Sequence, residues 1–138
     1  MEVRQGRSLT AARVAARLVR EELQQMFALA AASIDADMYG PEAGEHPLPL
    51  EVWKESSALL AAELTDEEWA VLASATRSAT NVRVNLQMTN PRPSPIDRID
   101  ETDREAYEAL RDNSEAAVKV LSAFLERTRP RAHRRRQK

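Results

Sequence analysis

The residues of this sequence that best suit metal chemistry are two histidines and the acids beside one of them. His46 follows Glu42 by four positions and Glu45 by one, and His133 stands near the C-terminus. Helical bundles bind paired metal ions through inward-pointing glutamates and Glu-x-x-His motifs carried on helices. His46 lies instead within residues 40–49, whose three prolines and two glycines predict a loop. We therefore expect no metal site and no cofactor.

Paired acids can serve general acid–base catalysis, and two adjacent pairs occur, Glu21-Glu22 and Glu67-Glu68. Neighbouring positions on a helix point about 100° apart, so neither pair converges on one reacting atom. A serine nucleophile needs a positioned base, usually histidine, and both histidines fall in segments with no helical pattern. The three glycines, at positions 6, 40 and 44, cannot form a phosphate-binding loop, and there is no cysteine. The sequence predicts no catalytic residue and no enzyme.

The strongest functional feature of the sequence is its basic C-terminus. The last twelve residues, 127–138, contain seven Arg or Lys and no acid, whereas the other 126 residues hold 13 bases and 22 acids. Clustered guanidinium groups bind nucleic acid or another polyanion through charge rather than base sequence. The candidate polyanion-binding residues are Arg129, Arg131, Arg134, Arg135, Arg136 and Lys138. The same residues can instead complement the negative end of a helix or the acidic body of the chain, so both interpretations stay open.

A second basic group, Arg13, Arg17 and Arg20, has the spacing of one helical face. We interpret it as a solvated face opposite the apolar stripe, because neither Trp nor Phe anchors that turn to a membrane surface. The prolines at 91, 93 and 95 miss the Pro-x-x-Pro spacing of SH3 ligands and indicate a stiff connector.

Four helices must position these groups. Apolar residues recur at steps of three and four along four segments, which we predict to be helices. They are residues 9–38, 50–64, 66–89 and 102–129. Gly40 is the expected C-cap of the first helix. Thr65 with Glu68, and Thr102 with Glu105, have the spacing of capping boxes at the starts of the third and fourth helices.

Four amphipathic helices favour an all-α fold, an antiparallel four-helix bundle with three long helices and one short one. The chain of 138 residues suits one domain, residues 1–130, followed by a disordered Arg-rich tail, residues 131–138. Trp53 and Trp69 are expected to pack together. The longest uncharged run, residues 23–34, is too short to span a bilayer, so we expect a cytoplasmic protein. Its 23 alanines predict a thin core, which leaves a homodimer with a shared core open.

The sequence contains two motifs that end in tryptophan, Leu48-Pro-Leu-Glu-Val-Trp53 and Leu64-Thr-Asp-Glu-Glu-Trp69. With the Leu59-Leu60 pair between them, they resemble a group of small helical-bundle proteins from GC-rich actinobacterial genomes, over residues 18–86. The resemblance implies a long first helix, a loop, a Leu-Pro-x-x-x-Trp helix and an acidic cap before the second Trp. Some relatives carry a transmembrane helix ahead of the first helix, and this sequence has none there. The group has no activity to transfer.

The sequence as a whole favours a non-enzymatic helical-bundle protein that acts in protein interaction or self-association. The partner would be another protein or a second copy of the chain. The alternative is an accessory protein that binds nucleic acid or another polyanion through its basic tail.

Overall fold

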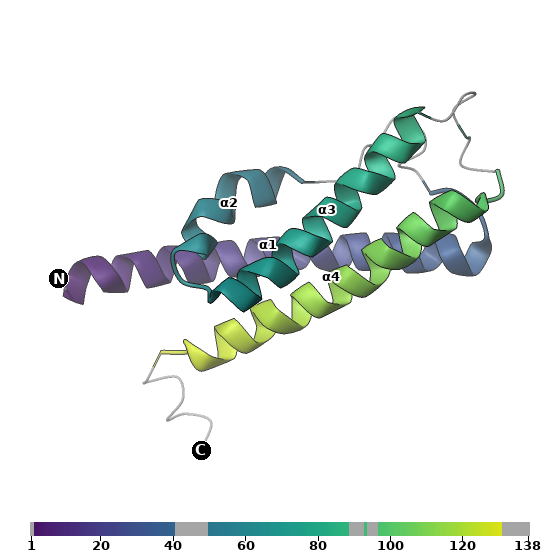
Figure 1. Ribbon diagram of the computed structural model, residues 1–138. Coiled ribbons are helices and arrows are strands. Elements are labelled where there is room, and N and C mark those ends of the chain that lie inside the picture. The colour runs from purple at the N-terminus through teal and green to yellow at the C-terminus, as the bar shows by residue number, and fades with distance from the viewer. Residues whose placement is uncertain (1, 41–49, 89–92, 94–96, 131–138) are drawn as a thin grey trace, which may run out of the picture.

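The computed structural model describes residues 2–40, 50–88, 93 and 97–130, and for residues 2–7 the helical backbone alone. Within these residues the chain forms four helices and no strand (Figure 1). The helices are α1 (Glu2–Ala36), α2 (Glu51–Ala61), α3 (Asp66–Met88) and α4 (Glu101–Arg127). The predicted all-α bundle of three long helices and one short helix is confirmed. The predicted disorder of residues 131–138 lies outside the described residues.

Two of the predicted helix lengths were wrong. The first helix begins at Glu2 rather than at residue 9, because a single glycine at position 6 lowers helix stability by only about 1 kcal/mol and does not stop the helix. The second helix ends at Ala61 rather than at residue 64. There the amides of Glu63 and Leu64 both donate to the carbonyl of Leu60, at 3.0 and 2.9 Å, which turns the chain toward α3.

The end of α1 is capped by Asp37 and not by Gly40. Asp37 has φ of 53°, in the left-handed region, and its amide donates to the carbonyl of Ile34 at 3.2 Å. The amide of Met38 donates to the carbonyl of Ser33 at 3.2 Å. These two bonds are the Schellman pattern, in which one left-handed residue satisfies the last carbonyls of a helix. Aspartate tolerates this conformation better than most residues, and two arginines hold its carboxylate.

The capping box at Thr65 is confirmed, and the one at Thr102 is wrong. The hydroxyl of Thr65 accepts from the amide of Glu68 at 3.1 Å, while the carboxylate of Glu68 accepts from the amide of Thr65 at 2.9 Å. In α4 the N-cap is Asp100, whose carboxylate accepts from the amide of Asp103 at 2.7 Å. Asp100 precedes Thr102 by two positions and is an equally good capping residue, so the helix starts at the earlier one.

Helix α4 packs along both α1 and α3, whereas α2 covers the N-terminal part of α1 (Figure 1). Contacts between distant residues show that α1 and α4 run antiparallel: Arg13 of α1 reaches Thr128 after α4, and Asp37 after α1 reaches Arg104 of α4. Ser8 of α1 likewise donates to Glu63 beyond the end of α2. The core lies where α1, α3 and α4 face each other, and it includes Leu23, Met26, Leu72, Tyr107, Leu110, Leu121 and Phe124.

Helices α2 and α3 touch sparingly. The predicted contact of Trp53 with Trp69 is confirmed, with ring centroids 5.2 Å apart and planes tilted by 32°. Trp53 lies in the first turn of α2 and Trp69 in the first turn of α3. The bundle is therefore tight around α4 and open between α2 and α3.

Candidate functional site

Two arginines hold the left-handed Asp37 that ends α1. Arg98 Nε donates to one carboxylate oxygen at 2.8 Å, and Arg104 Nη2 donates to the other at 2.7 Å. Hydrogen bonds from Arg104 and Arg98 hold the pKa of Asp37 below its ordinary value. Because Arg104 lies on α4 and Arg98 just before it, this cluster ties the end of α1 to the start of α4.

A buried tyrosine–aspartate pair lies beside this cluster. Tyr39 Oη donates to the carboxylate of Asp103, and the same oxygen accepts from the amide of Asp100 at 3.4 Å. Burial raises the pKa of Asp103 above its ordinary range, and the neighbouring Asp100 acts in the same direction. Burial and the bond to Asp103 likewise raise the pKa of Tyr39. Asp103 is only 3% exposed, so this pair joins the segment after α1 to α4 with its carboxyl group shielded from solvent.

Glu22 of α1 caps the start of α2. Its two carboxylate oxygens accept from the amides of Val52 and Trp53, both at 3.1 Å. The residue before α2 is Leu50, which has no side-chain acceptor for these amides. Burial raises the pKa of Glu22, while the two amides act in the opposite direction. Glu22 therefore supplies from another helix the cap that α2 lacks, and its role is structural.

The interpretation of Arg13, Arg17 and Arg20 as a solvated stripe was wrong for two of the three. Arg13 Nη1 donates to the carbonyl of Leu125 at 2.7 Å and to the hydroxyl of Thr128, at the C-terminal end of α4. Burial, followed by the charge of Arg17, lowers the pKa of Arg13. Arg20 donates to the hydroxyl of Ser122 at 3.3 Å. Of the three residues only Arg17 is exposed, because the stripe borders the α1–α4 seam.

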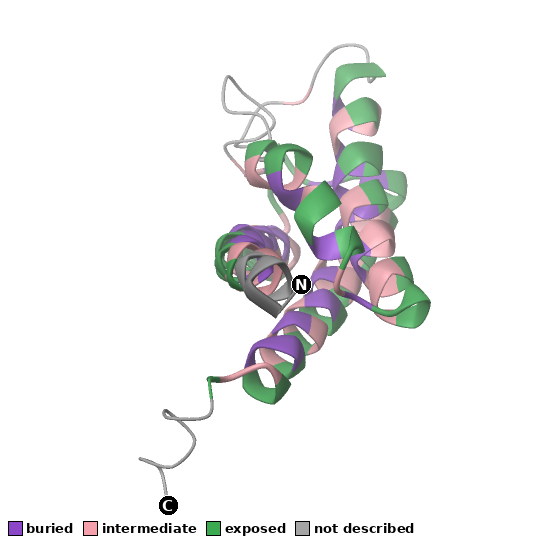
Figure 2. Cartoon of the chain, turned by 90° about the vertical axis from the view of Figure 1, so that its left-hand side faces the viewer, coloured by how far each residue is buried: buried purple, intermediate pink, exposed green. Residues whose placement is uncertain are grey.

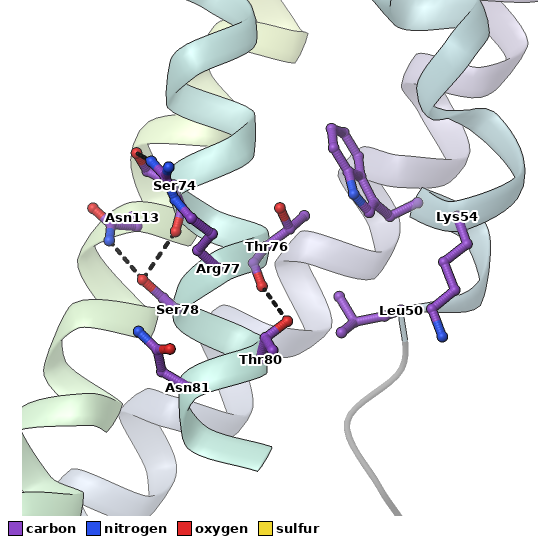
Figure 3. Close-up of a pocket in the computed structure, with 10 residues that line it drawn as sticks. Leu50, Lys54, Ser74, Thr76, Arg77, Ser78, Thr80, Asn81 and Asn113 are labelled. Carbon is purple, nitrogen blue, oxygen red and sulfur yellow. Dashed lines mark hydrogen bonds between the residues drawn. The ribbon is translucent and has the colours of Figure 1, made fainter. Parts of the chain in front are cut away.

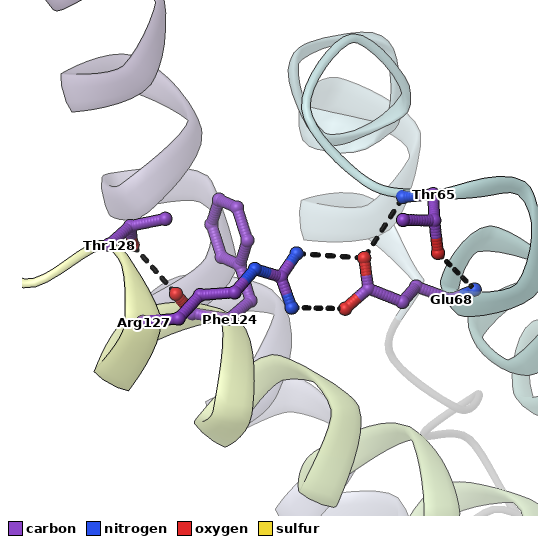
Figure 4. Close-up of polar contacts among 5 residues, drawn as sticks. All are labelled: Thr65, Glu68, Phe124, Arg127 and Thr128. Atoms are coloured by element: carbon purple, nitrogen blue, oxygen red, sulfur yellow. Dashed lines mark hydrogen bonds and ion pairs between the residues drawn. The ribbon is translucent and has the colours of Figure 1, made fainter.

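The start of the basic tail is engaged with acids of the bundle. Arg127 forms a two-point ion pair with Glu68 of α3, and its guanidinium lies 5.2 Å from the centre of the Phe124 ring (Figure 4). The hydrogen bonds from Arg127, and after them those from Thr65, lower the pKa of Glu68 to about 2. Arg129 pairs with Glu126 at 3.0 Å. The other candidate polyanion-binding residues, Arg131, Arg134, Arg135, Arg136 and Lys138, lie outside the described residues.

A cleft of about 540 Å³ opens between α2 and α3 and continues over the side of α3 that faces α4 (Figure 3). It is lined by Leu50, Trp53, Lys54, Ser74, Thr76, Arg77, Ser78, Thr80, Asn81 and Asn113. Among these, the hydroxyls of Thr76, Ser78 and Thr80 each donate to a backbone carbonyl of α3 at 3.0 Å. Their protons are therefore engaged, and the hydroxyls can only accept from a ligand.

The two cations of this cleft do not converge. Arg77 turns along α3 and donates to the hydroxyl of Ser74 at 3.2 Å, whereas Lys54 lies on α2 across the cleft (Figure 3). Asn113 donates to Ser78 at 2.7 Å on the side of α3 away from Lys54. An anion bound to one cation would not reach the other, so this cleft does not have the convergent polar groups of a small-molecule site.

The outer side of α1 combines exposed apolar side chains with small ones. Val14 and Leu18 are 50% and 46% exposed. Figure 2 shows exposed positions along one side of α1, turned away from the rest of the bundle. We define the outward face of α1 as the exposed residues that helical spacing places on this side, Val14, Arg17, Leu18, Glu21, Gln25, Ala28, Ala32, Asp35 and Ala36.

A hollow lies at the C-terminal end of the outward face of α1. It encloses about 380 Å³ and is lined by Leu29, Ala32, Ser33, Ala36, Met38, Tyr39 and Gly40. Its walls are almost wholly apolar, and the small side chains of Ala32 and Ala36 leave the space open over about one turn of α1. The hollow and the exposed Val14 and Leu18 therefore occupy opposite ends of one helix surface.

Groups of three or more metal-ligating side chains do not occur among the described residues, and both histidines, His46 and His133, lie outside them. Nor does any helix in the described ranges have the length and apolarity needed to cross a membrane. Comparison with protein families, curated proteins and solved structures finds no match to this chain. The resemblance to actinobacterial helical bundles stays a prediction.

The residues that the structure brings together do not stand out in the sequence. Glu22 was set aside as half of a non-convergent acid pair, and Asp37 and Tyr39 were not singled out. The signal for Glu22 was a helix start without a capping side chain at Leu50, which calls for an acceptor from elsewhere. The signal in the sequence for the outward face of α1 was the spacing of eighteen residues from Val14, Arg17 and Leu18 to Ala32, Asp35 and Ala36, which places each pair on one line of a helix.

Proposed function

We propose that the protein is a non-catalytic helical bundle that acts by binding protein through the outward face of α1. The observation that carries this proposal is the exposure of Val14 and Leu18, which stand four residues apart on a helix with about half of each side chain open to solvent. Single exposed apolar residues are ordinary, but a pair on a helical face whose other end carries an apolar hollow offers two apolar contact points for a partner.

The polar groups of the bundle support a non-catalytic role. The buried acids Glu22 and Asp103 accept hydrogen bonds from α2 and from Tyr39, so both serve the packing of helices. The ion pair of Glu68 with Arg127 joins α3 to α4. Each of these three carboxyl groups has a shifted pKa, and each has a structural partner that accounts for its position.

Polyanion binding through the basic tail is the alternative, and it rests on composition alone. Arg127 and Arg129 already pair with Glu68 and Glu126. The candidate residues beyond position 130 lie outside the described residues. Removal of residues 131–138 should abolish salt-sensitive binding to a fluorescent duplex or RNA if the tail is the functional part, and should leave association through α1 unchanged.

A photo-crosslinking amino acid placed at position 18 tests the proposal in the cells that naturally produce the protein. Position 119 on α4 is the matched control, because Lys119 is 75% exposed and lies outside the outward face of α1. We expect covalent protein adducts, of any composition, from position 18 and none from position 119. The proposal is wrong if position 18 gives no protein adduct, or if both positions give the same adducts.

A further inference from the structure

The two ends of the outward face of α1 have complementary shapes. Val14 and Leu18 project from the N-terminal end, and Ala32 and Ala36 line the hollow at the C-terminal end. Because an α-helix has about 3.6 residues per turn, Val14 and Ala32 are separated by about five full turns, and so are Leu18 and Ala36. Each large residue therefore lies on the same line of the helix as a small one. One copy of the chain cannot bring these ends together.

The same spacing relates two opposite charges. Arg17 and Asp35 are also about five turns apart, and both are exposed. In the described part of the chain neither forms an ion pair. Arg17 lies beside the projecting end of the outward face and Asp35 beside the hollow. The large and small side chains and the two opposite charges are therefore separated by the same distance along α1. The N-terminal end of the outward face is complementary to its C-terminal end in both shape and charge.

We propose that the outward face of α1 binds a second copy of this chain, with the two α1 helices antiparallel about a two-fold axis near Gln25. An antiparallel pair with Gln25 facing Gln25 places Val14 opposite Ala36 and Leu18 opposite Ala32 of the second copy. Arg17 then comes within about one helical turn of Asp35 of the second copy. A two-fold axis repeats every contact, so both projections fill both hollows and both charges are paired.

This inference rests on the proposed function and names its partner. The seam runs from Val14 to Ala36, about 33 Å at 1.5 Å per residue. One helix from each copy buries less surface than a standard protein interface, so the dimer should dissociate in the micromolar range or above. A second copy is favoured over an unrelated partner because a single surface supplies both the projections and the hollows.

Single-cysteine variants test the register directly, because the chain has no cysteine of its own. Gln25→Cys should form a disulfide-linked dimer under mild oxidation. An equimolar mixture of Leu18→Cys and Ala32→Cys should form a mixed disulfide, whereas Leu18→Cys alone should not. Lys119→Cys is the exposed control on α4 and should stay monomeric. The inference is overturned if Leu18→Cys links to itself as readily as to Ala32→Cys, since that indicates parallel or random contact.

A charge exchange tests the pairing without large changes of volume. We expect Arg17→Asp or Asp35→Arg alone to weaken the dimer about fivefold in sedimentation equilibrium, as two exposed ion pairs are lost at about 0.5 kcal/mol each. The double variant should return to within about twofold of the original, because it restores both pairs with reversed sign. Lys119→Asp should leave dissociation unchanged, and circular dichroism checks that each variant stays helical.

The outcomes separate this inference from the proposed function. A chain that sediments as a monomer up to millimolar concentration, yet forms adducts with other proteins from position 18, overturns the dimer and keeps the binding face. A chain that sediments as a monomer and forms no adduct overturns both. Dimers that survive Leu18→Glu and both single charge reversals also overturn the inference, because the seam then lies elsewhere.

Discussion

The ion pair between Glu68 and Arg127 should stabilise the bundle in a pH-dependent way. Glu68 is 16% exposed and accepts two hydrogen bonds from Arg127, which ties the start of α3 to the end of α4 (Figure 4). These bonds, together with those from Thr65, lower the pKa of Glu68 from 4.5 to about 2. One pKa unit corresponds to about 1.4 kcal/mol, so the lowering from 4.5 to about 2 represents at most about 3.5 kcal/mol. Arg127 is 45% exposed, and solvent screening reduces the expected contribution to about 1.5 kcal/mol.

The assay is a double-mutant cycle of Glu68→Gln and Arg127→Gln, followed by urea unfolding at several pH values. The cycle isolates the pair from the stacking of Arg127 on Phe124, which the single variant also removes. Glu68 has a lowered pKa in the folded state, so its contribution is present above pH 4.5 and is lost as the pH falls toward 2. We expect a coupling energy of about 1.5 kcal/mol at neutral pH, decreasing steadily over that range.

The pair of Glu126 with Arg129 provides the matched control. It also lies at the end of α4, but Glu126 is 66% exposed, so its coupling energy should be below about 0.5 kcal/mol. The reasoning is refuted if the Glu68–Arg127 coupling is no larger than this control, or if it does not change between pH 4.5 and 2.

Three further perturbations have distinct outcomes. Glu22→Ala should cost about 1–2 kcal/mol and speed hydrogen exchange at the first amides of α2, since those amides lose their acceptors; unchanged exchange would contradict this role. Leu110→Ala, at a fully buried position, should cost about 2–5 kcal/mol in urea unfolding, whereas Met88→Ala, at 79% exposure, should cost less than about 0.5 kcal/mol. The pKa of Asp103 is raised, so its stabilising effect is present at low pH and is lost as the pH rises. Asp103→Asn should therefore gain stability relative to the unmodified chain as the pH rises above about 4, and a difference independent of pH would contradict the burial argument.

Elements that depend on residues close in sequence were predictable. The reciprocal cap of Thr65 and Glu68 forms as its spacing of three predicts, because both partners lie within one turn. The Trp53–Trp69 contact is also short-range in sequence, since the two residues lie in the first turns of consecutive helices. The period of apolar residues likewise defines four helices, because burial of one face requires it.

The sequence did not predict which of two nearby residues caps a helix end. Asp100 and Thr102 are both good N-caps, and only the path of the chain before α4 decides between them. Asp37 ends α1 ahead of Gly40 because Arg98 and Arg104, which are distant in sequence, stabilise its carboxylate. Apart from Arg129, the candidate polyanion-binding residues lie outside the described residues, so the structure does not test them.

The sequence by itself determined the helices, their amphipathic faces and the repeat of large, small and charged residues along α1, because these depend on the helical period alone. Only the tertiary structure decided which polar groups became internal. Glu22, Arg13 and Asp103 are ordinary charged residues in sequence, and each becomes a link between helices once another helix supplies its partner. The outward face of α1 is likewise decided by packing: α2 is short and α4 covers the opposite side, so one side of a long helix stays open to solvent.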